Sequence, residues 1–437
     1  MLKQNKTFQG GLILKTEKQQ TDALLIEKLP APRIVVIPLL QHTGGKPARP
    51  MVKTGDHVSM GQQIGGAEKC GSAAVHASVS GTIIAVSRYP FSENSETFAV
   101  TIENDGEDEF ASPIPYDKTW HETAADDLIG KIAVSGVVDF NGSALPAHEK
   151  LLAAKNRMSG LSLILNAMVT EPLVSADYRI LIEQTEKVLT GGLICKKITG
   201  AESLSIVVND KNSAVEEALT ALLSQEPFKE ISLQKLKPKY PQHHEKLFMP
   251  LAGRNTLVLG AATAACIRDA VIECVPWFQR VVTIAGPAAG SPKNLLVRLG
   301  TPAIELLKAG GVDLAKTKKI VSGGPLSGTA LPILDTPVIK STTALLALDS
   351  AGLKNESIAC INCGRCVSVC PMRLSPMRLA HLARTNDCIE AKAWHIDECI
   401  DCGCCAYVCP SSINLVHYLQ YGRQQSLRPV RQKVPAA

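Results

Sequence analysis

Two cysteine runs near the end of the chain constrain the fold more than any other feature. Ten of the 14 cysteines lie between Cys360 and Cys409. Nine of them form "CINCGRCVSVCP" from Cys360 and "CIDCGCCAYVCP" from Cys399, which share the spacing C-x2-C-x2-C-x3-C-P. Such density in one segment indicates bound metal, because disulfide frameworks spread their cysteines more evenly over a secreted chain.

The spacing of both runs is typical of bacterial ferredoxins. Three close cysteines of one run hold one [4Fe-4S] cluster, and the fourth ligates the other cluster. The predicted ligand sets are Cys360, Cys363, Cys366 and Cys409 for the first cluster, and Cys399, Cys402, Cys405 and Cys370 for the second. The alternative, a pair of structural zinc sites, leaves the third cysteine and the Cys-Pro ending of each run unexplained. Neither run ends in C-x2-C-H, so attached haem is not indicated.

The segment between the runs predicts a helical two-cluster domain. In "SPMRLAHLARTNDCIEAKAWHID", Leu379, Leu382 and Ala383 fall on one helical face. Cys404 lies between two predicted ligands and is interpreted as a small apolar filler. Cys388 is expected to be a buried neutral thiol. Two clusters in one small domain carry electrons from one partner to another.

Length and composition predict several globular domains. At 437 residues, with 45% hydrophobic and 20% charged residues, the chain exceeds the size of one core. We expect domains at 1–110, 111–275, 276–350 and 351–420, with a mildly basic tail at 421–437. Few aromatic residues and a net charge of only +5 argue against a nucleic-acid partner. No apolar run is long enough to span a bilayer and no secretory signal is visible, so a cytoplasmic location is expected.

The first region predicts a small β-barrel or sandwich. Short strands are separated by glycines in "VKTGDHVSMGQQIG" and "VHASVSGTIIAV". The first stretch resembles a biotinyl or lipoyl carrier domain, but "VHASVSG" offers no lysine for a swinging cofactor. A structural or docking domain is therefore the preferred interpretation.

The middle of the chain predicts a Rossmann-like domain followed by a β-grasp insert. The strands expected at "LSLILNA" and "LSIVVND" alternate with helical segments, which favours a parallel sheet. From Arg280, a strand pair precedes an amphipathic helix that ends at Gly310 and Gly311, as in a β-grasp domain.

Over nearly its whole length the chain resembles the RnfC family, the C subunits of the Rnf electron transport complexes. The resemblance rests on "FQGGLIL", "VIPLLQHTGGKPARPMVKTGDHVSMGQQIG", "EPLVSADYRIL", "RVVTIAGPAAGSPKNLLVRLGTP", "IVSGGPLSG" and both cysteine runs. It implies a peripheral subunit on the cytoplasmic face of a membrane complex. Such complexes couple electron transfer between ferredoxin and NAD to Na⁺ or H⁺ movement. It also implies a middle domain similar to the flavin-binding subunit of respiratory complex I.

The resemblance places a flavin and nucleotide loop at "SGVVDFNGSALPAHEKL", where the family typically reads G-I-V-G-L-G-G-A-A-F-P-T-H-V-K-L. Gly136, Gly142 and Lys150 match, whereas Asp139 and Asn141 replace glycines. Glycines let bare N–H groups approach phosphate, and a carboxylate there opposes it. A second family stretch, N-G-A-E-C-E-P-Y, corresponds to "NAMVTEPL", which keeps Glu171. These departures predict a loop that keeps its fold and loses FMN and NADH.

The leading hypothesis is an electron-transfer subunit with two [4Fe-4S] clusters. It would be held at the membrane by other subunits of the complex, and would exchange electrons with a ferredoxin-like or cytochrome carrier and not with NADH. No catalytic residue of its own is predicted. The first alternative is an NADH-handling subunit with FMN in an altered loop. The second is a structural docking adaptor whose clusters only add rigidity.

Overall fold

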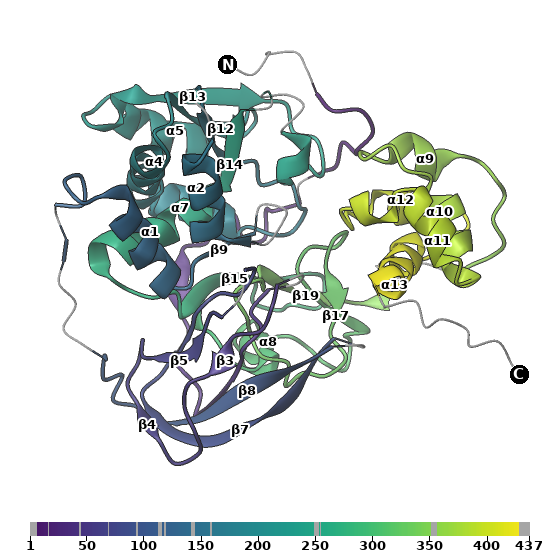
Figure 1. Ribbon diagram of the computed structural model, residues 1–437. Helices are drawn as coiled ribbons and strands as arrows, with labels where there is room; N and C mark the ends of the chain where they lie inside the picture. Colours follow the sequence, from purple (N-terminus) through teal and green to yellow (C-terminus); the bar gives the residue numbers. More distant parts are fainter. Residues whose placement is uncertain are drawn as a thin grey trace, which may run out of the picture. The chain divides into compact units, whose positions relative to one another are not determined.

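The computed structural model describes residues 7–15, 17–42, 45–68, 70–92, 95–111, 116–117, 119–140, 145–157, 160–248, 253, 255–350 and 356–427 (Figure 1). The described residues form two compact units. The first contains residues 15–238 and 242–350, and the second contains residues 7–14, 239–241 and 356–427. Within the described residues, no helix combines the length and apolar character needed to cross a membrane.

The first unit begins with the predicted barrel-sandwich domain. One antiparallel sheet has the order β2 (Ile34–Pro38), β8 (Ser95–Asn104), β7 (Gly81–Ser92) and β4 (His57–Val58). A smaller sheet contains β3 (Arg49–Pro50), β5 (Gln63–Gly66) and β6 (Val75–His76). Alternate residues of these strands, among them Val35, Ile37, Ile64 and Ile102, point inward and are fully buried.

The Rossmann-like domain has the predicted parallel sheet, in the order β13 (Ile231–Leu236), β12 (Ser203–Asn209), β11 (Ser162–Ala167) and β14 (Thr256–Gly260). Its helices are α1 (Ala125–Val134), α2 (Ala147–Lys155), α3 (Ala176–Glu183), α4 (Thr185–Thr199), α5 (Ser213–Leu223) and α7 (Ala261–Arg268). Both faces of the sheet are buried, which accounts for the almost continuous apolar runs of β11 and β12.

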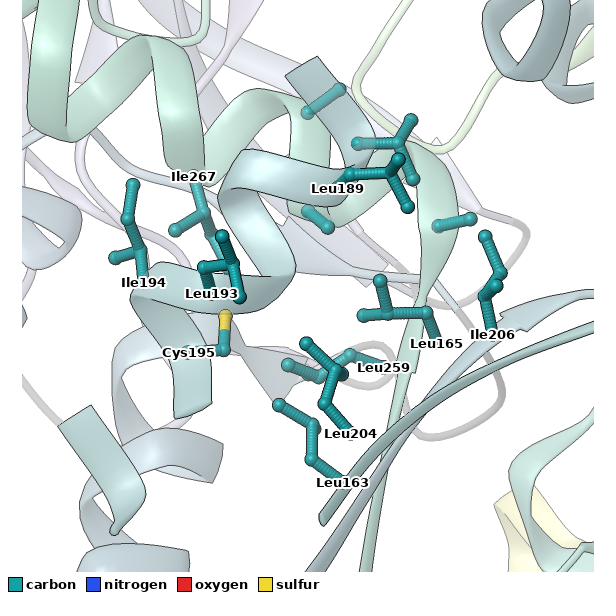
Figure 2. Close-up of a cluster of buried hydrophobic side chains, with 14 of the residues drawn as sticks. Leu163, Leu165, Leu189, Leu193, Ile194, Cys195, Leu204, Ile206, Leu259 and Ile267 are labelled. Carbon is teal, nitrogen blue, oxygen red and sulfur yellow. The ribbon is translucent and has the colours of Figure 1, made fainter. Parts of the chain in front are cut away.

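Among the described residues, the largest buried apolar cluster surrounds this sheet and includes helix α4. Leu163, Leu165 and Leu204 of the strands belong to it together with Leu189 and Cys195 of the helix, whereas Ile194 lies beside Ile267 of α7 (Figure 2). Helix α4 also approaches α7 closely, since a Cβ on Gly191 would lie 1.8 Å from the carbonyl oxygen of Ala264. The pair of glycines in "LTGGLI" therefore serves helix packing, and not a turn.

The β-grasp domain follows. Its strands β15 (Gln279–Ala285), β16 (Lys293–Arg298), β17 (Lys319–Ser322) and β19 (Ala344–Leu348) lie in the order β16-β15-β19-β17, with helix α8 (Ala303–Ala309) between β16 and β17 in the sequence. Strand β18 (Thr329–Ala330) pairs with β17, and β1 (Ile26–Lys28) pairs in parallel with β16. The sequence did not indicate that β1, near the start of the chain, belongs to this sheet.

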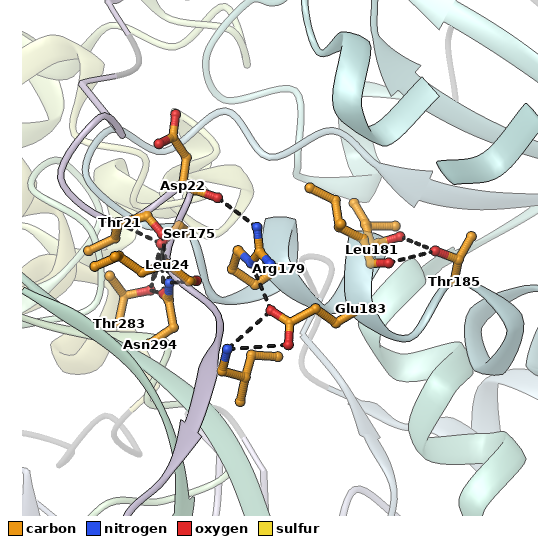
Figure 3. A network of polar contacts seen from close by, with 12 residues as sticks. Thr21, Asp22, Leu24, Ser175, Arg179, Leu181, Glu183, Thr185, Thr283 and Asn294 are labelled. Carbon is orange, nitrogen blue, oxygen red and sulfur yellow. Dashed lines mark hydrogen bonds and ion pairs between the residues drawn. The ribbon is translucent and has the colours of Figure 1, made fainter. Parts of the chain in front are cut away.

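A buried polar network holds the segment before β1 against two domains (Figure 3). The hydroxyl of Ser175, just before α3, lies 2.7 Å from both Thr21 Oγ1 and Asn294 Oδ1. Arg179 donates to the carbonyl oxygen of Asp22 at 2.9 Å and pairs with Glu183 at 2.8 Å. These contacts explain why "EPLVSADYRIL" is rich in polar residues despite its burial.

The second unit is helical, as predicted. It contains α9 (Arg365–Val369), α10 (Pro376–Arg384), α11 (Cys388–Ala393), α12 (Cys404–Tyr407) and α13 (Leu415–Leu427). Leu379, Leu382 and Ala383 are buried together on α10, so the predicted helical face is confirmed. Cys388 is only partly buried, at the start of α11, whereas the sequence predicted a buried thiol.

Candidate iron–sulfur and flavin sites

The two cysteine runs adopt the same backbone conformation at matching positions. The left-handed residues of the first run recur 39 positions later in the second, as the pairs Asn362 and Asp401 (both φ 53°), Gly364 and Gly403 (71° and 77°), and Arg373 and Ser412 (57° and 51°). The helix that follows each run also begins with this offset, at Pro376 and Leu415. The glycine in each run allows the sharp turn that starts a short helix behind the middle cysteines.

One cavity is lined by Cys404 and by four other cysteines from the two runs. Cys370 of the first run lies there with Cys399, Cys402 and Cys405 of the second, and Leu374, Val416 and Leu419 supply apolar walls. These four cysteines are the set that the spacing predicts for the second cluster. The backbone N–H of Leu374 donates to Cys370 Sγ at 3.4 Å, as expected around thiolates that ligate a cluster.

Burial makes three of these four thiols poor anions on their own, whereas the hydrogen bond with Cys404 lowers the pKa of Cys402. Burial raises the pKa of Cys370 and of Cys399, and it raises the pKa of Cys405 to about 12. A positively charged metal centre reverses this preference, because a coordinated thiol is deprotonated. The four side chains and their apolar surroundings therefore fit an iron–sulfur cluster.

The other four cysteines lie in more open surroundings. Cys360 and Cys363 are exposed, Cys366 is buried and Cys409 is partly buried. The chain just before Cys360 is paired with the chain just after Cys409. Ile358 N–H donates to the Ser411 carbonyl oxygen at 3.0 Å, and the Ser411 hydroxyl donates to the Ala359 carbonyl oxygen at 2.9 Å. The fold thus brings the ends of the two runs together.

No three His, Cys, Asp or Glu side chains in the described part of the chain converge as they would around a single ion. A cubane spreads its ligands over several irons, so its cysteines stand farther apart than those of one zinc. Cys404 is fully buried and lines the same cavity as the four cysteines. Its thiol interacts with Cys402, and this hydrogen bond, together with burial, raises the pKa of Cys404.

At the flavin-type loop, Lys150 is neutralised by the protein's own carboxylates. Its ammonium group donates to Asp139 at 2.7 Å, to Glu245 at 2.5 Å and to the Val258 carbonyl oxygen at 3.0 Å. Burial lowers the pKa of Lys150, but attraction by Asp139 and Glu245 outweighs this effect and raises it. All three N–H protons of the cation are engaged, which leaves none for a phosphate.

Asp139 is the last residue of β9 (Val138–Asp139), which pairs with the hairpin strand β10 (Leu145–Pro146), and it is fully buried against the start of α7. Its second oxygen accepts from Gly260 N–H at 3.0 Å and from the Thr263 hydroxyl at 2.8 Å. A helix N-terminus is a favourable position for an anion, and here a side-chain carboxylate takes it. The described residues of the loop therefore do not fit a flavin phosphate at this helix.

Gly136 meets a different requirement from the one predicted. Its φ is +67°, and a Cβ would lie 2.2 Å from the Ala74 carbonyl oxygen. Lys340 donates to the carbonyl oxygens of Ala74 and Gly136, both at 2.8 Å. Packing among three domains thus accounts for this glycine. Asn141 and Gly142 lie outside the described residues.

Glu171 lies apart from Lys150, in a group of charges that the sequence did not connect. One oxygen accepts N–H groups of Leu326 and Ser327 at 3.1 and 3.2 Å, in the turn of "SGGPLSG". The other oxygen is buried and, among the described residues, has no hydrogen-bond partner. Lys18 is electrostatically coupled to Glu171, and burial lowers the pKa of Lys18 to about 7. Lys18 precedes Glu171 by more than 150 positions, so no local pattern could reveal the pair.

Three family matches cover most of the chain. Residues 6–107 match the RnfC Barrel sandwich hybrid domain, residues 132–271 the Nuo51 FMN-binding domain, and residues 359–413 the 4Fe-4S dicluster domain. A solved NAD⁺-reducing [NiFe]-hydrogenase in the H2-reduced state is 16% identical with a TM-score of 0.49, over 72% of this chain and 65% of that chain.

Curated relatives span the whole arrangement of domains. The C subunit of the proton-translocating ferredoxin:NAD(+) oxidoreductase complex of Clostridium ljungdahlii is 34% identical over 89% of this chain and 86% of its own length. The corresponding protein of the Na(+)-translocating complex of Acetobacterium woodii is 32% identical over 87% and 88%. The C subunit of the ion-translocating oxidoreductase complex of Pseudomonas aeruginosa is 34% identical over 98% of this chain and 56% of its own length. The chain belongs to the RnfC family, the C subunits of the Rnf-type ion-translocating oxidoreductase complexes.

Proposed function

We propose that this protein carries electrons through two [4Fe-4S] clusters in an Rnf-type complex that couples ferredoxin-linked redox chemistry to Na⁺ or H⁺ translocation. The first cluster is held by Cys360, Cys363, Cys366 and Cys409, and the second by Cys399, Cys402, Cys405 and Cys370. The observation that carries the proposal is the cavity lined by the second set, which draws one cysteine from the first run.

When bound, each cluster supplies one-electron exchange. The protein's residues supply the surroundings: thiolate ligands, N–H donors such as that of Leu374, and apolar walls from Leu374, Val416 and Leu419 that keep water from the second set. The exposed Cys360 and Cys363 leave the first cluster accessible to a redox partner. Electrons therefore enter or leave at the first cluster and are relayed by the second.

The partners we propose are the other subunits of the complex and a ferredoxin-like or cytochrome carrier. The protein is attached to the cytoplasmic face of the membrane through those subunits. The names of its relatives, which are C subunits of ion-translocating oxidoreductase complexes, support the other subunits of such a complex as partners.

The electron partner is a carrier other than NADH. This part of the proposal rests on the network at Lys150, where Asp139 and Glu245 neutralise the only cation that the loop was expected to offer a phosphate. Anaerobic purification followed by iron, sulfide and flavin analysis tests it directly. We expect about eight irons per chain, little flavin, and reduction by ferredoxin or a cytochrome but not by NADH.

A second candidate is an FMN-containing subunit that accepts hydride from NADH. The unpartnered Glu171 oxygen, together with Asp177 Oδ1 and Arg280 Nη1, which are also buried without a partner among the described residues, favours a polar ligand of the first unit. The relatives are also named as ferredoxin:NAD(+) oxidoreductases. Stoichiometric FMN and rapid bleaching by NADH would establish this candidate and overturn the first.

A further inference from the structure

A short segment near the start of the chain belongs to the helical unit. Residues 8–12 pair with residues 239–241 through an antiparallel bridge, in which Leu12 and Tyr240 exchange N–H donors at 2.9 and 2.8 Å. Phe8 and Tyr240 are 7% and 1% exposed, and Lys239 lies over the Phe8 ring. We call residues 8–12 and 239–241 the clamp.

The clamp contacts the chain at two ligands of the second cluster. The Tyr240 hydroxyl donates to the carbonyl oxygen of Cys402 at 2.6 Å. Gly11 N–H donates to the carbonyl oxygen of Val369 at 2.7 Å, one residue before Cys370. Gly10 lies so close that a Cβ there would be 2.6 Å from the Cys370 carbonyl oxygen. The clamp therefore grips both runs, each at a cysteine that lines the cavity.

We propose that Tyr240, with Gly10 and Gly11, is a positioning element for the second cluster, which fixes Cys370 and Cys402 and keeps water away from their sulfurs. The inference rests on the proposed two-cluster function. A reduced cluster carries one more negative charge than an oxidised one, so exclusion of water disfavours reduction. The clamp thereby holds the second cluster at a lower potential than an open cavity would give.

The test is a redox titration of the full chain, followed by electron paramagnetic resonance. Tyr240→Phe removes the hydroxyl and keeps the ring. We expect the wave of the second cluster to move to higher potential while the wave of the first stays in place. A Cys402→Ala variant, which lacks the second cluster, identifies that wave. Gly10→Ala places a Cβ against the Cys370 carbonyl oxygen and so displaces the backbone of the clamp. We expect it to give a larger shift in the same direction.

Two matched variants control for general effects. Tyr421→Phe removes another tyrosine hydroxyl of the same unit, which contacts Asn386. Gly200→Ala adds a Cβ at another left-handed glycine, with nothing within 4 Å. Neither is expected to move either wave. Pulsed resonance after exchange into D2O provides a second readout, since Tyr240→Phe should bring more exchangeable deuterons near the second cluster only.

The outcomes are distinct. Equal movement of both waves, or an unmoved second wave with unchanged deuteron coupling, overturns the inference. Loss of the second wave alone from Gly10→Ala supports it, whereas loss of both waves counts against it. A wild-type protein with only one cluster would instead overturn the proposed function.

Discussion

The four-cysteine cavity and the Lys150 network are both polar sites in apolar surroundings, but they are balanced in opposite ways. Burial raises the pKa of three of the four predicted ligands in the cavity, Cys370, Cys399 and Cys405, and the described residues that line the cavity include no compensating charge. The Lys150 site is already compensated by Asp139 and Glu245. A site that binds a charged cofactor needs charge that the protein itself leaves uncompensated. The loop at Lys150 has no such charge left, because Asp139 and Glu245 already compensate the lysine.

The largest expected effect is at the cavity. Cys402→Ala should lose the second cluster and about half of the iron, because three cysteines no longer complete the site. Cys404→Ala, its matched control two positions on, should keep both clusters. Iron and sulfide analysis of anaerobically purified protein measures both. If Cys404→Ala lost as much iron, Cys404 would be a ligand and not a filler.

The next largest effect is expected at the Lys150 network, when its partner Asp139 is replaced. Asp139→Asn should lower the free energy of unfolding of the first unit by about 3 kcal/mol, because it removes one charged partner from a buried ion-pair network. Asp117→Asn is the matched control. It alters a more exposed pair with Lys131 and should cost less than about 1 kcal/mol. Urea unfolding followed by tryptophan fluorescence measures both. A neutral Asp139→Asn would mean that Glu245 alone compensates Lys150.

Lys340 is a second buried lysine to compare with Lys150. Its ammonium group hydrogen-bonds to the carbonyl oxygens of Ala74 and Gly136 and not to carboxylates. Burial lowers its pKa to about 7, against about 10.4 in an unfolded chain. Between these values the unfolded chain binds more protons, so stability should rise with pH by up to about 1.4 kcal/mol per unit. Lys340→Met should lack this rise. Unfolding midpoints of both proteins from pH 7 to 9 decide it, and parallel curves would show that Lys340 stays charged when folded.

The smallest expected effect comes from two arginines at matching positions in the two halves of the cluster unit. Arg423 donates to the Cys399 carbonyl oxygen at 2.8 Å and pairs with Asp401, whereas Arg384, at the matching position 39 residues earlier, lies over the Tyr418 ring. Arg423→Ala should lower the free energy of unfolding of the second unit by about 1 kcal/mol, since its ion pair with Asp401 is partly exposed. Arg384→Ala should cost about half as much. The rate of iron release to a chelator is measured for both variants. Equal rates would show that the two arginines contribute equally to the stability of the unit.

The sequence predicted the parts of the molecule that depend on local spacing. The cysteine runs, the buried face of α10 and the alternation of strands and helices all follow from patterns within a few tens of residues. The departure of Asp139 from the family loop was also visible, but its partners were not. Glu245 follows Asp139 by more than 100 positions, in a stretch without periodicity.

The clamp was missed for the same physical reason. It pairs Leu12 with Tyr240 through backbone groups, and backbone pairing across 228 positions leaves no mark on side-chain periodicity. "FQGGLIL" signalled family resemblance only. Its glycines are explained by close approaches: a Cβ on Gly10 would lie 2.6 Å from the Cys370 carbonyl oxygen, and one on Gly11 would lie 2.6 Å from the Tyr240 carbonyl oxygen.

The clamp also limits when the second cluster site can assemble during synthesis of the chain. Gly10 leaves the ribosome 360 residues before Cys370, which at about 5–20 residues per second is a delay of tens of seconds. Throughout that interval Phe8 lacks the partner surface of the helical unit. Iron loading of the second site must therefore wait for the last part of the chain, and a fusion placed at the start of the protein sits close in sequence to the residues that close that site.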